Sequence, residues 1–298
     1  MSTNGRGEHP PITGRTRVVG VIGWPVAHSL SPPMHNAALA ELGLDWVYVA
    51  YPVAPDRVGD AVAGVRGLGI VGLNVTIPHK QAVVPHLDDL DQTARDLEAA
   101  NTIHNRDGRL LGYNTDGPGL LRALAEAEAQ VDGKRVAVLG AGGSARAVAF
   151  ALCRAGIAGL SLLNRTPARA EELASLLADR AGFADARVAG LVGDESRRAV
   201  EQAEVLVDCT SVGMHPREDV PPVVPAEWLH EGQVVCDLTY TPRDTVLLKA
   251  ARARGARTVD GTGMLVHQGA IALEIWTGAK APVETMRAAL FECLDTHG

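Results

Sequence analysis

Short apolar runs alternate with segments of helical periodicity along most of the chain. In the first part, this pattern predicts strands at residues 17–23, 45–53 and 70–78, with helices at 32–42, 55–67, 79–87 and 91–100. Strands that alternate with helices are typical of a largely parallel sheet, so we expect an α/β domain here.

Two local signals refine this first part. Ser31 stands before Pro32, and the pair predicts a helix N-cap followed by the first helical residue. Asp107 and Gly108 separate two short apolar runs, and this dipeptide predicts the turn of a β-hairpin.

The second part of the chain shows the same alternation. After a helix at residues 117–129, apolar runs predict strands at 135–140, 159–165, 205–210, 234–240 and 256–261. Helices are predicted at 141–156 and after the Thr166-Pro167 pair. Two helical stretches, 264–276 and 282–294, come last with no strand behind them. We expect these two helices to return and cover the first domain.

The length of the chain, 298 residues, fits about two domains. We expect a polar tail at residues 1–15, a first domain at 16–116 completed by 264–298, and a second domain at 117–263. The tail has no apolar segment, so it does not resemble a signal peptide. No apolar run is long enough to cross a membrane.

Charge and cysteine content exclude several classes of protein. The chain has 28 Lys and Arg against 35 Asp and Glu, a net charge of -7, and no basic cluster marks a nucleic-acid-binding face. The four cysteines are far apart in sequence, which excludes zinc-ribbon and thioredoxin motifs and fits a reducing cytoplasm. The histidines are scattered without an H-E-x-x-H motif, so we expect no metal site.

A glycine-rich loop follows the predicted strand at residues 135–140 and opens a helix. Gly140, Ala141, Gly142 and Ala145 have the G-x-G-x-x-A spacing of a dinucleotide-binding fingerprint in its strand–turn–helix context. Gly140 permits the tight turn, and Gly142 lets the backbone approach a pyrophosphate at the helix N-terminus. The alternative is a glycine turn in an unrelated α/β fold.

The end of the following strand indicates which dinucleotide is bound. NAD sites usually place Asp or Glu there to hold the ribose 2′-hydroxyl. This chain has Asn164-Arg165-Thr166, with Arg169 one turn further, and no carboxylate. Because Arg pairs well with phosphate, we predict NADP(H) rather than NAD(H), the alternative being an ordinary solvated arginine.

Polar residues also gather at the strand ends of the first domain. Ser29 and Ser31 lie at the start of a helix, where two hydroxyls and the positive helix end suit a carboxylate, although simple capping would also explain Ser31. Thr76 lies near the end of the third predicted strand and Lys80 follows it, and such strand ends are where α/β sheets bind ligands.

Asp116 lies at the junction of the two domains, where we expect a cleft. Near a carbonyl that accepts a hydride, an ammonium such as that of Lys80 can stabilise the developing oxyanion and deliver a proton. A carboxylate beside the ammonium would orient it.

Nine motifs in a fixed order resemble those of shikimate dehydrogenases. They extend from about residue 18 to residue 278: VIGWPVAHSLSPPMHN, NVTIPHK, AANTI, GYNTDG, GAGGSARAV, NRT, CTSVGM, DLTYTP, and DGTGMLVHQGA with EIWTG. The resemblance implies NADPH-dependent reduction of 3-dehydroshikimate to shikimate, a step in chorismate and aromatic amino-acid biosynthesis. It implies an α/β substrate-binding domain, a Rossmann-like NADP-binding domain and C-terminal helices that return to the substrate domain. A homodimer is an expectation at the level of the family.

The resemblance also assigns roles to residues. Lys80 matches the catalytic lysine, and Asp116 matches the aspartate paired with it. Residues that match substrate contacts are Ser29, Ser31, Thr76, Asn101, Tyr240 and Gln268. Residues that match the cofactor pocket are Gly140, Ala141, Gly142, Gly143, Ser144, Asn164, Arg165, Thr166, Arg169, Leu238 and Gly261.

The chain departs from the family pattern at three places. Asp208 begins D-C-T-S where N-A-T-S is frequent, Thr262 stands where Leu is common, and Leu273 stands where an aromatic residue is common. These positions concern the cofactor side and helix packing. Two alternatives remain open: a sibling dehydrogenase acting on quinate or an amino analogue, and a catalytically silent NADP-binding sensor.

Overall fold

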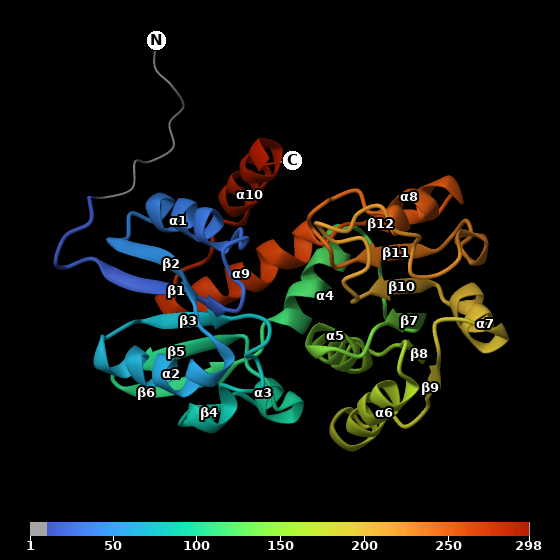
Figure 1. The fold of residues 1–298 in the computed structure, drawn as a ribbon, viewed down its shortest axis with the longest axis horizontal. Coiled ribbons are helices and arrows are strands. Elements are labelled where there is room, and N and C mark those ends of the chain that lie inside the picture. Colours follow the sequence, from blue (N-terminus) through green and yellow to red (C-terminus); the bar gives the residue numbers. More distant parts are fainter. Residues whose placement is uncertain (1–10, 298) are drawn as a thin grey trace, which may run out of the picture. The chain divides into compact units, whose positions relative to one another are not determined.

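The computed structural model describes residues 11–297, which form two compact units (Figure 1). The first unit contains the residues up to Thr115 together with those from Leu265 onward. The second unit is Asp116–Met264. Each unit is built on its own six-stranded sheet.

The sheet of the first unit has the strand order β2-β1-β3-β5-β6-β4. The strands are β1 (Arg17–Gly23), β2 (Trp46–Pro52), β3 (Gly72–Val75), β4 (Asp89–Leu90), β5 (Thr102–Arg106) and β6 (Arg109–Tyr113). Only β5 runs antiparallel to its neighbours, so the predicted largely parallel sheet is confirmed. The predicted hairpin is confirmed too, because Asp107 and Gly108 join β5 to β6 with positive φ angles of 52° and 89°.

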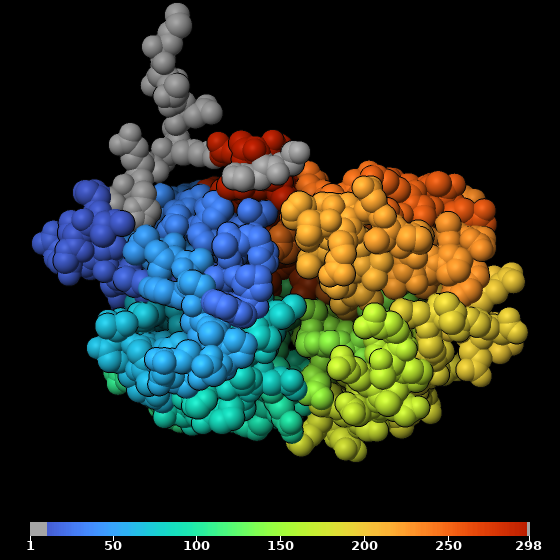
Figure 2. All heavy atoms as spheres, in the orientation of Figure 1, coloured from blue at the N-terminus to red at the C-terminus, as the bar shows by residue number. Residues whose placement is uncertain are grey.

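Both faces of this sheet are covered by helices. The helices are α1 (Ser31–Glu41), α2 (Val58–Gly67), α3 (Gln92–Leu97), α9 (Thr262–Thr277) and α10 (Val283–His297), with 3₁₀ turns at η1 (Pro55–Arg57) and η2 (Val84–His86). On one face, Val19 and Val21 of β1 pack with Met34 of α1, Leu273 of α9 and Leu290 of α10. The predicted return of the C-terminal helices is therefore confirmed, and Figure 2 shows α10, in red, next to α1.

Two local predictions for the first unit are wrong. Ser31 is the first residue of α1 rather than its cap, because Leu30 occupies the N-cap position and the Ser31 side chain turns elsewhere. The helix predicted at residues 79–87 is a series of turns that ends in η2. Pro85 explains this second error, since proline lacks the N–H that a continuing helix needs.

The sheet of the second unit is entirely parallel, with the order β12-β11-β10-β7-β8-β9. Its strands are β7 (Arg135–Leu139), β8 (Gly159–Leu163), β9 (Ala186–Ala189), β10 (Val205–Asp208), β11 (Val234–Asp237) and β12 (Arg257–Val259). Numbered from β7, this is the 3-2-1-4-5-6 order of a Rossmann fold. The chain reverses its direction across the sheet between β7 and β10, which creates a topological switch point.

The helices of the second unit are α4 (Asp116–Glu126), α5 (Gly143–Arg154), α6 (Pro167–Ala181), α7 (Asp194–Gln202) and α8 (Val246–Ala253), with a 3₁₀ turn at η3 (Ala226–Trp228). The sequence did not predict β9, α7 or α8. The edge strand β9 is short and only half-buried, and α7 is rich in charge, so neither presents a clear apolar run.

The described residues contain no helix long and apolar enough to cross a membrane. Nor does any group of three or more His, Cys, Asp or Glu in residues 11–297 have the arrangement of a metal site.

Candidate active site

The loops after β1 and β3 bring four predicted residues to one edge of the first sheet. The two strands are parallel neighbours, and the Thr76 amide donates to the Ile22 carbonyl at 2.9 Å where they end. Ser29 and Ser31 follow β1, while Thr76 and Lys80 follow β3. The carboxyl ends of neighbouring parallel strands are a frequent place for a ligand.

The two serines are held close together by the start of α1. The Ser31 amide donates to Ser29 Oγ at 3.3 Å. Ser29 is half-buried, and Ser31 is only 8% exposed. Both serines thus lie at the positive end of a helix, which suits a carboxylate. The nearby strand β2 carries Tyr48, which was not predicted as a site residue; it is buried, and its Oη donates to Asn74 Oδ1 at 2.8 Å.

Asn101 belongs to a buried network of polar side chains. Its Nδ2 donates to Thr115 Oγ1 at 2.9 Å, and its Oδ1 accepts from the Thr115 amide at 2.8 Å. Thr115 Oγ1 in turn donates to the backbone carbonyl of Gln268 at 3.1 Å. Asn101 and Gln268, two predicted substrate contacts far apart in sequence, are thus joined through Thr115.

The sequence analysis missed Thr115 and its neighbours Asn74 and Thr102 as parts of this network. Asn74 Nδ2 donates to Thr102 Oγ1 at 3.1 Å, and both side chains are buried. The available signal was a polar residue inside an apolar strand, because a buried amide is stable only when it is hydrogen-bonded.

Lys80 and Asp116 lie in different units. Lys80 is half-buried in the first unit, and its carbonyl accepts from the Ala100 amide at 2.8 Å, next to Asn101. Asp116 is the first residue of α4 in the second unit and is 4% exposed. Their pairing stays a prediction from the sequence.

The glycine loop of the second unit meets the steric requirements of a phosphate site. Gly140 follows β7 with a φ of 100°, and its amide donates to the Leu163 carbonyl at 2.7 Å. Gly142 is the N-cap residue of α5, so the helix has no side-chain cap. A Cβ added at Gly142 or Gly143 would meet no atom within 4 Å. The helix N-terminus therefore faces open space with its N–H groups available to an anion.

The neighbouring residues of the glycine loop also fit a phosphate-binding site. Ala145, in the first turn of α5, is fully buried, as close packing of helix against strand requires. Ala141 and Ser144 are half-buried beside the two exposed glycines. The fit to a dinucleotide pyrophosphate thus rests on the loop's backbone as well as on the motif.

The loop after β8 carries the residues predicted to select the cofactor. Asn164 Nδ2 donates to the Thr166 carbonyl at 2.8 Å and fixes the turn. Arg165 and Arg169 are exposed, and neither forms an ion pair with another residue of the described range. The two guanidinium groups can therefore pair with a phosphate, and no carboxylate of this turn is present to hold a 2′-hydroxyl instead.

Loops after β11 and β12 touch through a glycine. A Cβ on Gly261 would lie 2.2 Å from the Leu238 carbonyl oxygen, so only glycine fits at this position. Tyr240 is half-buried nearby, and burial raises the pKa of its hydroxyl. The same two loops are also joined by an ion pair, in which Arg243 Nε lies 3.1 Å from Asp260 Oδ2.

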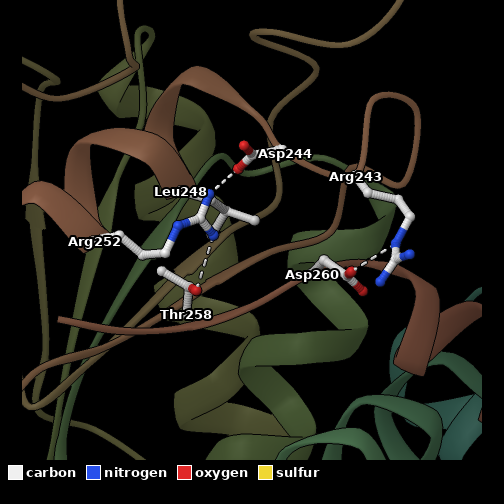
Figure 3. A pocket seen from close by; sticks show the side chains of 6 residues that line it. All are labelled: Arg243, Asp244, Leu248, Arg252, Thr258 and Asp260. Carbon is white, nitrogen blue, oxygen red and sulfur yellow. Dashed lines mark hydrogen bonds and ion pairs between the residues drawn. The ribbon is translucent and has the colours of Figure 1, made fainter. Parts of the chain in front are cut away.

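A hollow of about 300 Å³ opens beside this ion pair (Figure 3). Its lining residues are Arg243, Asp244, Leu248, Arg252, Thr258 and Asp260. Its charged side chains are paired with one another, Arg252 with Asp244 and Arg243 with Asp260. No residue of the glycine loop lines this hollow, and neither do Arg165 and Arg169.

Comparison with known proteins agrees with this arrangement over nearly the whole chain. The family model described as shikimate dehydrogenase substrate binding domain matches residues 21–103, shikimate / quinate 5-dehydrogenase matches 123–245, and shikimate 5'-dehydrogenase C-terminal domain matches 261–291. A Methanopyrus kandleri protein named shikimate dehydrogenase (NADP(+)) is 52% identical over 285 residues, covering 95% of this chain and 98% of the relative. The chain belongs to the shikimate dehydrogenase family.

Solved structures of the family have the same fold. A shikimate dehydrogenase in complex with NADP+ superposes with a TM-score of 0.90 at 42% identity, covering 95% of this chain and 98% of that one. The Thermus thermophilus shikimate 5-dehydrogenase in complex with NADP(H) and shikimate has a TM-score of 0.84 at 38% identity, covering 94% and 100%. The predicted fold class, a substrate-binding α/β domain with a Rossmann-like domain, is confirmed.

One departure from the family pattern creates a pair of buried carboxyl groups. Asp208 ends β10 directly opposite Asp237 at the end of β11, and both are at most 1% exposed. Burial and the neighbouring Asp237 raise the pKa of Asp208 to about 7. Asp208 accepts from the Thr210 amide at 2.7 Å, and Asp237 accepts from Thr245 Oγ1 at 2.6 Å. Sequence analysis noted the substitution at Asp208 but missed the pair, because strand register brings the two residues together.

Proposed function

We propose that the protein catalyses the reversible NADPH-dependent reduction of 3-dehydroshikimate to shikimate, a step in chorismate and aromatic amino-acid biosynthesis. The observation that carries the proposal is the 52% sequence identity, over 95% of this chain, to a relative named shikimate dehydrogenase (NADP(+)). The polar strand ends of the first unit and the glycine loop of the second unit support it.

The two units divide the work. The proposed substrate-binding and catalytic domain is residues 16–116 completed by 264–298, and the proposed NADP-binding domain is residues 117–263. These bounds assign Asp116 and Met264 to the substrate-binding domain, although both belong to the second compact unit. The first unit offers hydroxyl and amide groups at a sheet edge, which suits a small polyhydroxy acid. The second unit offers free backbone N–H groups at a switch point, which suits a pyrophosphate.

The Ser29 and Ser31 hydroxyls bind the substrate carboxylate at the N-terminus of α1. Their partial burial strengthens such hydrogen bonds, since fewer water molecules compete for the anion. The ring and its hydroxyl groups are held by Thr76, Asn101, Tyr240 and Gln268.

The cofactor is NADP(H), and the loops of the second unit would hold its phosphates and ribose. Bound NADPH supplies the hydride that reduces the substrate carbonyl. The pyrophosphate is held by the loop Gly140, Ala141, Gly142, Gly143 and Ser144. The 2′-phosphate is held by Asn164, Arg165, Thr166 and Arg169, and the rest of the dinucleotide contacts Leu238 and Gly261.

Lys80 and Asp116 supply the proton chemistry. As the substrate carbonyl is reduced, negative charge develops on its oxygen, and the Lys80 ammonium stabilises that charge and donates a proton to the same oxygen. The Asp116 carboxylate orients the ammonium. In the reverse direction, the neutral Lys80 amine accepts the hydroxyl proton.

We further propose a setting for the enzyme, in which the homodimer is an expectation from the family alone. It acts on small molecules without a nucleic-acid or membrane partner, in the cytoplasm, as a homodimer. The four cysteines, Cys153, Cys209, Cys236 and Cys293, are all free thiols, which supports a reducing compartment. Light scattering coupled to size-exclusion chromatography tests the dimer.

The loss of NADPH absorbance on adding 3-dehydroshikimate tests the proposed function. We expect turnover that depends on both compounds, with shikimate preferred over quinate and NADP+ over NAD+ in the reverse direction. Preferential turnover of quinate or of an amino analogue would favour a sibling dehydrogenase. NADPH binding without turnover of any of these substrates would identify a silent NADP-binding sensor.

A further inference from the structure

Lys80 lies in a segment of turns between the end of β3 and η2, so neither a helix nor a strand fixes its position. The Lys80 carbonyl accepts from the Ala100 amide at 2.8 Å, which holds the backbone at this point. The Lys80 ammonium sits at the end of a flexible four-carbon stem. It can reach a reacting atom in a fixed geometry only when the backbone beneath it is also fixed.

His79, directly before Lys80, provides a second anchor for this segment. Its side chain is buried, with His79 only 1% exposed, and its Nε2 lies 2.7 Å from the Val53 carbonyl oxygen. Because a carbonyl oxygen can only accept, Nε2 carries a proton and donates it. Breaking this bond would leave a buried carbonyl without that donor, which is costly in a site shielded from water. The imidazole ring is therefore held in one orientation.

Val53, the acceptor of this bond, is itself firmly placed. It directly follows β2, and its amide donates to the Gly23 carbonyl, at the end of β1, at 3.1 Å. Its side chain belongs to a buried apolar cluster that also contains Ile22 of β1 and Val83, which lies later in the Lys80 segment. The Val83 amide donates to the His79 carbonyl at 3.0 Å. His79 thus ties the Lys80 segment to the ends of two neighbouring strands.

Thr76, the proposed substrate contact in the same segment, is held by a bond of its own. Its amide donates to the end of β1 at 2.9 Å, which continues the pairing of β1 with β3. The two serines proposed to bind the substrate carboxylate belong to another segment, at the start of α1. Loss of the bond between the His79 ring and Val53 should therefore displace Lys80 and leave the substrate-binding groups in place.

We propose that His79 is a positioning residue for Lys80. The hydrogen bond from His79 Nε2 to the Val53 carbonyl fixes the turn that carries Lys80, so that the ammonium meets the substrate oxygen in the geometry that proton transfer needs. This inference rests on the proposed function of Lys80 as the proton donor. In this role His79 acts through Lys80 and exchanges no proton with the substrate.

Two variants with side chains of nearly equal length test the proposal. His79→Met removes the donor, whereas His79→Gln offers an amide N–H to the same carbonyl. We expect His79→Met to lower kcat for 3-dehydroshikimate by about 10- to 100-fold, as for a small displacement of a catalytic group, with the KM changed less than about threefold. His79→Gln should restore most of kcat. His86→Met, at an exposed position of η2, is the matched control and should change neither constant.

A double-mutant cycle with Lys80→Ala separates positioning from a general structural role. If His79 acts through Lys80, then His79→Met should lower the residual kcat by less than about twofold once the Lys80 amine is gone. Independent effects that multiply in the double variant would overturn the proposal. So would equal kcat values in His79→Met and His79→Gln, or a raised KM with an unchanged kcat in His79→Met.

Thermal unfolding shows whether each variant is folded. If His79→Met does not fold, His79→Leu, which is smaller and also lacks a donor, takes its place in the same comparison. Loss of folding in both variants would assign the bond to the fold alone and overturn the proposal. Failure of the proposed function is distinguishable, because the unaltered chain would then not reduce 3-dehydroshikimate. An active parent in which Lys80→Ala keeps its kcat would refute the role of Lys80, and this inference with it.

Discussion

The two units both present their candidate site at the carboxyl edge of a sheet, but they build it from different parts of the chain. In the first unit, side chains form the site, and buried hydrogen bonds from Tyr48 through Asn74 and Asn101 to Gln268 hold several of them in place. In the second unit, backbone forms most of it, with an uncapped helix start after Gly142 and a glycine contact at Gly261.

This difference explains what each edge can do. Backbone N–H groups and a helix end bind a phosphate whatever the neighbouring side chains are, so they suit a cofactor shared by many enzymes. Side-chain hydroxyls, amides and an amine recognise one substrate and take part in its chemistry. Substitutions of site residues in the first unit should therefore change kcat or the substrate KM, and those in the glycine loop and the Arg165 turn of the second unit should change the constants for the cofactor. Asp116 and Tyr240 belong to the second unit but have proposed roles toward the substrate.

The largest effect is expected for Lys80→Ala. Loss of the proton donor should lower kcat by about 10²- to 10⁴-fold, the usual contribution of a general acid–base group. Substrate affinity should stay nearly unchanged, because the carboxylate contacts remain. Steady-state kinetics on both substrates measures this, with the exposed Lys280→Ala as control. An unchanged kcat would remove Lys80 from the mechanism.

Arg165→Ala tests the proposed side-chain contact with the 2′-phosphate in the second unit. Loss of a charge-assisted bond to the 2′-phosphate should raise the KM for NADPH by about 10- to 100-fold and leave the KM for NADH unchanged. The substrate KM should also stay the same. Arg187→Ala, on β9, is a control within the same unit. An equal loss with both cofactors would contradict a 2′-phosphate contact.

Gly261→Ala tests the close contact between Gly261 and the backbone of Leu238. The added Cβ would lie 2.2 Å from the Leu238 carbonyl oxygen, so the two loops must separate. We expect destabilisation of about 1–3 kcal/mol, or a Tm lower by about 2–10 °C, together with weaker NADPH binding. Gly159→Ala is the control, since its Cβ would make only an ordinary contact at 3.7 Å. A variant that kept the parent's Tm and NADPH affinity would show that the contact is dispensable.

The smallest effect concerns the pH dependence of stability at Asp208. Its pKa is about 7 in the folded chain, against about 3.9 for an unfolded aspartate. The folded chain therefore keeps a proton that the unfolded chain releases, and this group's contribution to stability is lost as the pH rises from about 4 to 7.

Asp208→Asn removes this titration and keeps a polar side chain of similar size. The variant should match the parent near pH 4 and exceed its Tm by about 2–8 °C at pH 8, as measured by thermal unfolding across that range. Asp185→Asn, at an exposed position of the same unit, should show no such trend. A Tm difference between Asp208→Asn and the parent that is independent of pH would contradict the raised pKa of Asp208.

The comparison also shows which features a sequence can reveal. The glycine loop was predicted because its backbone geometry admits few other residues, and the Asp107-Gly108 hairpin was predicted for the same reason. The α/β alternation and the returning C-terminal helices were predicted from apolar periodicity. The helix at residues 79–87 was wrong because apolar spacing was given more weight than Pro85.

The features that the sequence did not predict depend on tertiary contacts. Tyr48 lies in an apolar strand that fits a core position, and only the fold brings its hydroxyl to Asn74. Asp208 and Asp237 come from separate strands that become neighbours through sheet register. The site residues themselves came mainly from the resemblance, because strand ends in the sequence indicate a region and do not assign roles.

The most direct test of the central claim, that Lys80 protonates the oxygen formed by hydride transfer, is a crystal structure of the chain with NADP(H) and shikimate. We predict Lys80 Nζ within about 3.2 Å of the 3-hydroxyl oxygen, with the substrate carboxylate on Ser29 and Ser31. A structure in which Nζ lies beyond hydrogen-bond distance from that oxygen, or contacts the carboxylate instead, would contradict the mechanism.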